Sequence, residues 1–362
     1  MIDNHSFSAE WLTEKRKTHA KADPSIMEKV IYALCLLQQL KKSGLTFIFK
    51  GGTSLLLLLP DPARFSVDVD IVVSPDLSRE AIGEFLNKVK DEGIFVDMEL
   101  DEKRSYNGRI PKAHYRFVYQ SQYSGKPQEV LLDILFEKNQ YPVCVERAIA
   151  CEWIRLQANA LFVTTPDVNS LAGDKLTAFA PNTIGVPYGA EKEREIIKQL
   201  FDVGMLYPLI DNIETVKVSY KSIAAIEIAY RALPELTHED VLNDTIATAL
   251  ILARRESQEN ASDGARFSEL MLGIKQFIYF VYNGRFRIDD AILASAKAAL
   301  LAAAIKTDFQ GTLPVFDPSA ENGSYGIHHP EYSFLNKKLK HIRGGALFYW
   351  SEIVKLLYPY KI

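Results

Sequence analysis

The strongest constraint on the fold of this chain is a change in its hydrophobic pattern near residue 165. Before that point, strand-length runs of apolar and β-branched residues alternate with helix-period segments, whereas after it helix-period segments follow one another. A length of 362 residues fits two domains. The sequence therefore predicts an α/β (α+β) protein, with a mixed sheet and flanking helices in residues 1–165 and a helical domain in residues 166–362.

Composition and charge exclude several classes of protein. The chain is 48% hydrophobic and 24% charged, which is typical of a folded globular protein and not of a disordered one. Its formal net charge is -4, so any contact with nucleic acid must be local. The longest apolar stretches, 55–59 and 291–305, fall short of the roughly 20 residues that cross a bilayer, and the polar N-terminus is unlike a secretory signal. We expect a cytoplasmic protein without a membrane segment.

Turn and capping residues divide the first domain into short elements. Asp23 and Pro24 predict a helix start, because an N-cap carboxylate is followed by a proline at the first helical position, and Gly44 ends this helix. A short helix is expected from Thr53, and another is opened by Pro75. The predicted strands cover residues 45–49, 67–73, 94–100, 114–119 and 129–136.

The second domain is expected to be helical throughout. Polar, proline or glycine breaks separate its apolar-periodic segments. We place helices near residues 167–180, 190–206, 215–232, 238–256, 262–283, 288–306 and 335–358.

Two aspartates in one predicted strand are the most informative pair. Asp68 and Asp70 are two residues apart, so their side chains share one face of the strand, roughly 6–7 Å apart. Between apolar neighbours such carboxylates are costly to bury unpaired, and a bound cation is a usual compensation. The structural alternative is the solvent-facing side of an edge strand. The pair is a candidate metal site.

A glycine turn lies just upstream of this pair. Gly51 and Gly52, followed by Thr53 and Ser54, stand where a predicted strand meets a helix. Glycine lets the backbone approach a phosphate closely, and the first N–H groups of a helix favour an anion. Taken alone, the turn is better explained as a plain structural one. Beside a carboxylate pair it becomes a candidate phosphate cradle.

Asp133 is an acid inside an otherwise apolar predicted strand. If that strand lies beside the one with Asp68 and Asp70, Asp133 supplies a third oxygen ligand for Mg²⁺, which prefers carboxylates, phosphates and water. A hydrogen-bonded structural aspartate is the alternative.

The order of these motifs resembles the nucleotidyltransferase superfold, in which a glycine turn holds the triphosphate and an Asp-x-Asp strand holds divalent metal. The longer string, Lys50 to Leu55 followed by Arg64-Phe65-Ser66-Val67-Asp68-Val69-Asp70, resembles the AbiEii/AbiGii family of bacterial nucleotidyltransferase toxins. By this resemblance, Arg64 and Ser66 join the glycine turn in binding the nucleotide. The motifs that carry the resemblance span about residues 50 to 203.

The resemblance continues into the second domain. The family carries a Lys-x-x-Ala motif, matched by Lys175 to Ala178, and a later Lys-Asp-x-x-Asp-Leu-like motif, matched approximately by Lys198 to Val203. Gln199 replaces the first acid of the later motif. The resemblance implies that Lys175 contacts the nucleotide phosphates and that Asp202 completes the site. Their structural alternatives are a lysine that reaches solvent and a pair on an exposed helix.

These residues together predict transfer of a nucleoside monophosphate from an NTP to a hydroxyl, with Mg²⁺ or Mn²⁺ as cofactor and the site between the two domains. By the resemblance, the acceptor is RNA, with a tRNA 3′ end leading, and an antitoxin protein from an adjacent gene restrains the activity. Two other readings stay open. One is kinase-like transfer of the γ-phosphate, and the other is an NTP-binding regulatory module that acts through a protein partner.

Overall fold

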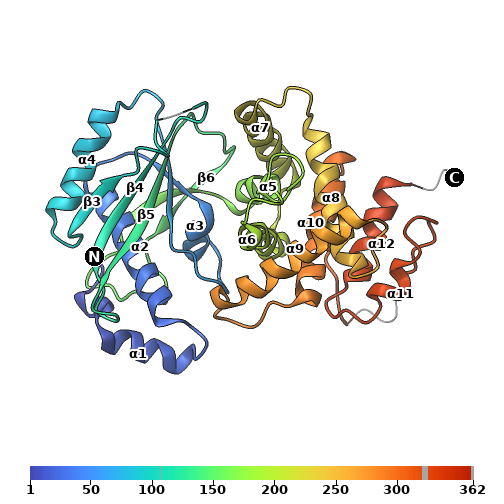
Figure 1. Ribbon diagram of the computed structural model, residues 1–362, viewed down its shortest axis with the longest axis horizontal. Coiled ribbons are helices and arrows are strands. Elements are labelled where there is room, and N and C mark those ends of the chain that lie inside the picture. Colours follow the sequence, from blue (N-terminus) through green and yellow to red (C-terminus); the bar gives the residue numbers. More distant parts are fainter. Residues whose placement is uncertain (107, 320–324, 360–362) are drawn as a thin grey trace. The chain divides into compact units, whose positions relative to one another are not determined.

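A computed structural model describes residues 1–106, 108–319 and 325–359 of the chain (Figure 1). The described residues form two compact units that are not contiguous in sequence. The first unit consists of Met1–Asn139, Cys144–Asp167 and Tyr279–Arg285. The second consists of Gln140–Val143, Val168–Ile278 and Phe286–Ile362, of which residues 320–324 and 360–362 are not described. Each unit has its own elements.

The first unit is built on one mixed sheet. Within the described residues it has seven strands: β1 (Ile48–Lys50), β2 (Val69–Val73), β3 (Asp97–Leu100), β4 (Lys112–Gln120), β5 (Pro127–Phe136), β6 (Cys144–Ala148) and β7 (Phe162–Pro166). Their order across the sheet is β3-β4-β5-β2-β1-β7-β6. The pairs β1–β7 and β2–β5 are parallel, and the other neighbouring strands are antiparallel. The predicted mixed sheet is confirmed.

Helix α2 (Pro24–Lys42) covers one face of this sheet. Asp23 caps it by accepting from the backbone N–H of Ser25 (2.8 Å), so the predicted helix start is confirmed. The helix packs against β2 and β5, and its buried apolar residues share one core with Val69, Ile71 and Val73. Because alternate residues of a strand point to opposite faces, the even-numbered positions of β2 project from the other face.

Three further helices belong to the first unit: α1 (Ala9–Thr18), α3 (Gly51–Leu58) and α4 (Arg79–Asp91). Helix α4 begins later than the sequence predicted. Ser78, not the Pro75-Asp76 turn, provides the N-cap, because its hydroxyl accepts from the backbone N–H of Ala81 (3.1 Å). Helix α3 begins two residues earlier than predicted, at Gly51 itself.

The second unit is helical. Its helices are α5 (Val168–Ala178), α6 (Glu193–Leu206), α7 (Ile213–Arg231), α8 (His238–Arg254), α9 (Ala261–Phe277), α10 (Ile288–Lys306), α11 (Leu335–Leu339) and α12 (Ala346–Leu357). Helix α10 is almost wholly buried and is packed against α6, α8 and α12. A Cβ atom at Gly204 would lie 2.8 Å from the Cβ of Ala294, so the absence of a side chain lets α6 approach α10 closely.

The structure also corrects the set of predicted strands and the last predicted helix. Neither β6 nor β7 was predicted from the sequence. In β6, apolar and polar residues alternate too little to indicate a strand. The single helix predicted over 335–358 is two helices. Helix α11 ends at Leu339, and Gly344 and Gly345 come directly before α12, with φ values of +83° and +85° that glycine adopts freely. Among the described residues, no helix combines the length and apolar character that a membrane crossing requires.

Candidate active site

Four side chains form a row across the sheet on the face opposite α2. Lys50 of β1 is in register with Asp70 of β2, Asp70 with Asp133 of β5, and Asp133 with His114 of β4. Residues directly opposite each other on neighbouring strands share one face, with Cβ atoms about 4.5–5.5 Å apart. We call Lys50, Asp70, Asp133 and His114 the polar row. It gathers two of the three aspartates predicted from the sequence on adjacent strands.

Asp68 lies one residue before β2, since the strand begins at Val69 and not at Val67 as predicted. Asp68 and Asp70 are both half-buried. The backbone carbonyl of Asp68 accepts a hydrogen bond of 2.5 Å from the hydroxyl of Thr53, in the first turn of α3. This bond ties the glycine turn to the backbone that carries the carboxylate pair.

Gly51 has a steric reason to be glycine. Its φ is +75°, and a Cβ atom there would lie 2.1 Å from Oδ2 of Asp70. A side chain at this position would strain the backbone and displace the carboxylate. No side chain caps the N-terminus of α3, which begins at Gly51. The start of the helix therefore lies directly against one of the predicted metal ligands, as the sequence hypothesis requires.

Gly52 packs against two other predicted site residues. A Cβ atom at Gly52 would lie 2.6 Å from Nη2 of Arg64 and 2.7 Å from Oγ of Ser66. Arg64 is 4% exposed and Ser66 is 3% exposed, and Nη1 of Arg64 donates to the backbone carbonyl of Phe65 (2.8 Å). The structure thus places Arg64 and Ser66 under the glycine turn, where they support it. A direct contact of either with a nucleotide stays a prediction.

The hydroxyls of Thr53 and Ser54 are directed at the backbone. Both residues are buried, and Ser54 donates to the carbonyl of Gly51 (2.8 Å) as Thr53 does to that of Asp68. These bonds occupy the hydroxyl protons. A phosphate bound at this turn would therefore be held by backbone N–H groups.

Asp133 has a partner that sequence reasoning missed. Its Oδ1 lies 2.5 Å from Nδ1 of His114, which is 7% exposed. In residues 1–106, 108–319 and 325–359, no group of three or more His, Cys, Asp or Glu side chains is placed to hold a metal ion. Metal binding by Asp68 and Asp70, and the role of Asp133 as third ligand, therefore stay predictions. The alternation of polar and apolar residues in β4 is the signal that places His114 on this face.

The second unit brings together the candidates from its two motifs. Nζ of Lys175 (α5) lies 3.0 Å from Oδ2 of Asp202 (α6) and donates to Oε1 of Gln199 (3.1 Å). Lys175 is 6% exposed and Asp202 is fully buried. The structural alternatives were a lysine that reaches solvent and an ion pair on an exposed helix. The burial of Lys175 and Asp202 contradicts both. Gln199, which departs from the family motif, directly contacts the lysine.

A segment distant in sequence supports the loop before the carboxylate pair. The backbone N–H of Phe65 donates to the carbonyl of Phe280 (2.8 Å), and that of Tyr282 donates to the carbonyl of Ala63 (3.1 Å). The ring of Tyr282 packs against Phe65 and Trp153, with centroids 4.5 and 4.7 Å apart. More than 200 residues separate Ala63 and Phe65 from Phe280 and Tyr282 along the chain, so no local pattern could predict these contacts.

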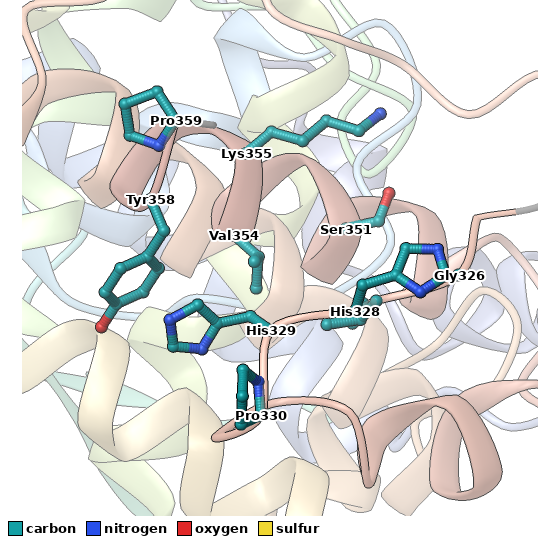
Figure 2. Close-up of a pocket in the computed structure, with 10 residues that line it drawn as sticks. Gly326, His328, His329, Pro330, Ser351, Val354, Lys355, Tyr358 and Pro359 are labelled. Atoms are coloured by element: carbon teal, nitrogen blue, oxygen red, sulfur yellow. The ribbon is translucent and has the colours of Figure 1, made fainter. Parts of the chain in front are cut away.

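His328 and His329 lie in the loop before α11 and differ in their exposure. His328 is exposed, but His329 is half-buried and its ring stacks on Tyr358, with centroids 4.1 Å apart. Both histidines line a cavity of about 350 Å³ in the second unit, together with residues of α12 (Figure 2). The cavity contains none of the motifs discussed above.

Comparison with known proteins identifies the family. The model of the family described as "Nucleotidyl transferase AbiEii toxin, Type IV TA system" matches residues 35–276, which include the glycine turn, the polar row, Lys175 and Asp202. A search of curated proteins gave no match. Two solved structures from Helicobacter pylori are similar to this chain at 14% identity. One is JHP933, with a TM-score of 0.41 over 78% of this chain and 93% of that one. The other is described as "putative nucleotidyltransferase from H. pylori", with a TM-score of 0.43 over 78% of this chain and 96% of that one. With its family model covering most of the chain, the protein belongs to the AbiEii nucleotidyltransferase toxins of type IV toxin–antitoxin systems.

Proposed function

We propose that the protein transfers a nucleoside monophosphate from an NTP to an RNA hydroxyl, with a tRNA 3′ end as acceptor, and that it requires Mg²⁺ or Mn²⁺. The observation that carries this proposal is the contact between the glycine turn and the carboxylate pair. Gly51 begins a helix whose first turn has no side-chain cap, and it lies against Asp70. A phosphate and a divalent cation bound here would be neighbours.

The residues present fit a divalent cation. Asp68 and Asp70 are half-buried carboxylates, and hard cations such as Mg²⁺ bind one or two carboxylates together with substrate phosphates and water. When bound, such a cation lowers the pKa of a hydroxyl and stabilises charge on phosphate oxygens. Asp68 and Asp70 would hold it, and Asp133 is the candidate for a further oxygen ligand.

The other residues have separate roles in this proposal. Backbone N–H groups from Gly51 to Ser54 bind phosphate oxygens, and the buried Arg64 and Ser66 keep the turn rigid. Rigid, pre-oriented donors stabilise the charge that develops as pyrophosphate leaves. For Lys175 and Asp202 we propose the roles that the family motifs imply: the lysine contacts the nucleotide phosphates and offsets their charge, and the aspartate completes the site.

The activity of a type IV toxin is expected to be restrained by an antitoxin, and we propose a protein from an adjacent gene. Expression of this chain alone should arrest bacterial growth, and expression with the neighbouring gene should relieve the arrest. Growth arrest that the neighbouring gene does not relieve would exclude that gene product as antitoxin.

Transfer of a labelled phosphate tests the reaction. Purified protein is incubated with Mg²⁺, total tRNA and each NTP, labelled at the α-phosphate in one series and at the γ-phosphate in the other. We expect only the α-label to reach RNA, and the base that gives transfer identifies the preferred NTP. Transfer of the γ-label would instead support the kinase-like reading. Nucleotide binding without transfer of either label, to RNA or to any other acceptor, would support the regulatory module.

A further inference from the structure

The geometry of the polar row points to His114 as a positioning residue. We propose that Nδ1–H of His114 binds one oxygen of Asp133 and thereby presents the other oxygen beside Asp70 as a further metal ligand. This inference rests on the proposed function, because it concerns the same carboxylate site. It assigns a role to a residue outside the family motifs.

The backbone fixes the position of His114 on three sides. In register with Asp133 on β5, it also donates its backbone N–H to the hydroxyl of Ser105 (2.8 Å), and its carbonyl accepts from the backbone N–H of Asp101 (2.8 Å). Ser105 is 1% exposed. An imidazole held by a strand and a buried turn has little freedom to move, so its ring can direct the carboxylate that it binds.

The hydrogen bonds of the imidazole determine which nitrogen carries the proton. Nε2 of His114 is buried and has no hydrogen-bond partner among the described residues, whereas Nδ1 lies 2.5 Å from Oδ1 of Asp133. A carboxylate oxygen accepts hydrogen bonds, and a ring nitrogen donates only when it carries the proton, so the proton belongs on Nδ1. Nδ1–H then donates to Asp133, and this bond leaves Oδ2 of the carboxylate for other contacts.

Asp133 is accessible where His114 is not. The side chain of Asp133 is 33% exposed, compared with 9% for that of His114. Asp133 is also the direct neighbour of Asp70 in the parallel pair β2–β5, so both carboxylates project from one face. A buried group that orients an accessible ligand is the usual arrangement around metal sites, where loss of such a group lowers metal affinity about 10–100-fold.

Mn²⁺ binding, followed by the electron paramagnetic resonance signal of free Mn²⁺, tests this inference. The titration includes an NTP analogue with a methylene between the α- and β-phosphates, so that no transfer occurs. We expect His114→Leu to weaken Mn²⁺ binding about tenfold. His114→Asn should bind nearly as wild type does, because its amide N–H replaces Nδ1–H. His114→Gln should bind Mn²⁺ as weakly as His114→Leu does, because its amide reaches the position of Nε2 and not that of Nδ1.

Two further variants separate positioning from a general effect on the fold. His114→Leu should have no additional effect in the Asp133→Asn background, because the histidine acts through that aspartate. His19→Leu is the matched control. It removes a histidine–carboxylate pair of 2.7 Å with Glu152 in the same unit but outside the polar row, and it should leave Mn²⁺ binding unchanged.

The inference would be overturned if His114→Leu bound Mn²⁺ with wild-type affinity. It would also be overturned if His114→Leu lowered the Mn²⁺ affinity equally in the wild-type and in the Asp133→Asn background. If His114→Leu does not fold, the comparison of His114→Asn with His114→Gln decides the question, and equal affinities in these two would overturn it. Asp68→Asn distinguishes this failure from that of the proposed function. If Asp68→Asn loses Mn²⁺ binding and the His114 variants do not, the metal site stands and only the role of His114 is excluded. If Asp68→Asn binds Mn²⁺ as the wild type does, both the metal site and the role of His114 are excluded.

Discussion

At the scale of single residues, Gly51 meets the strictest steric requirement of the candidate site. Two features exclude a side chain at this position: its φ of +75°, and the 2.1 Å that would separate a Cβ atom from Oδ2 of Asp70. We expect Gly51→Ala to reduce nucleotidyl transfer at least about tenfold, because displacing a reacting group by about 1 Å has effects of this size or larger. Left-handed backbone at a non-glycine residue adds about 1–2 kcal/mol of destabilisation.

Gly83, in the middle of α4, is the matched control. A Cβ atom there would meet no atom within 4 Å, and its φ is not in the left-handed region. Gly83→Ala should therefore preserve the transfer rate and stabilise the helix by about 0.5–1 kcal/mol. Equal transfer rates in Gly51→Ala and Gly83→Ala would contradict the steric argument.

Lys175 illustrates a residue whose importance to stability is separate from its proposed chemistry. Because it forms a buried pair with Asp202, Lys175→Met should destabilise the protein by about 3–5 kcal/mol, the usual effect of removing one partner of a buried ion pair. Urea denaturation measures this change. The double variant Lys175→Met/Asp202→Leu should recover much of the loss, since it removes both charges. A double variant no more stable than Lys175→Met would show that the pair does not account for the effect.

At the scale of elements, the segment 279–285 departs from the sequence prediction. A helix was predicted up to residue 283, but α9 ends at Phe277 and the segment belongs to the first unit. Its backbone bonds hold Ala63 and Phe65, just before the carboxylate pair, and the hydroxyl of Tyr282 donates to the carbonyl of Pro62. Tyr282→Phe removes only that last bond and should cost about 1 kcal/mol. Tyr282→Ala also removes the ring from its contacts with Phe65 and Trp153, and should cost about 3–5 kcal/mol.

Hydrogen exchange measures this support directly. The backbone N–H of Phe65, bonded to Phe280, should exchange faster in Tyr282→Ala than in Tyr282→Phe. If the backbone N–H of Phe65 in Tyr282→Ala is protected from exchange as in the wild type, the segment 279–285 does not stabilise the loop that carries Ala63 and Phe65.

The elements predicted correctly from the sequence are those with strong local signals. The cap at Asp23 and the β-branched run of β2 are such signals, and both elements lie close to their predicted positions. β6 could not be predicted, because its side chains are largely accessible and its sequence lacks an apolar alternation. The start of α12 has a local signal, the Gly344-Gly345 pair directly before it. A prediction from apolar spacing alone does not use this signal.

At the scale of the whole molecule, the two units divide the residues of the family motifs between them. The glycine turn and the polar row belong to the first unit, and Lys175 and Asp202 to the second. The sequence predicted one face for Asp68 and Asp70 because strand periodicity is local, but only Asp70 lies within β2. It did not give the pairing of Asp133 with His114 or of Lys175 with Asp202, because strand register and helix packing depend on contacts between distant residues.

The measurement that tests the central claim most directly is the initial rate of α-phosphate transfer to tRNA by Asp70→Asn. Asparagine keeps the size of the side chain but removes the charge that would hold a divalent cation beside the glycine turn. The account predicts a loss of at least about 100-fold in rate, with the circular dichroism spectrum and unfolding midpoint close to those of the wild type. A wild-type rate of transfer by Asp70→Asn would contradict it.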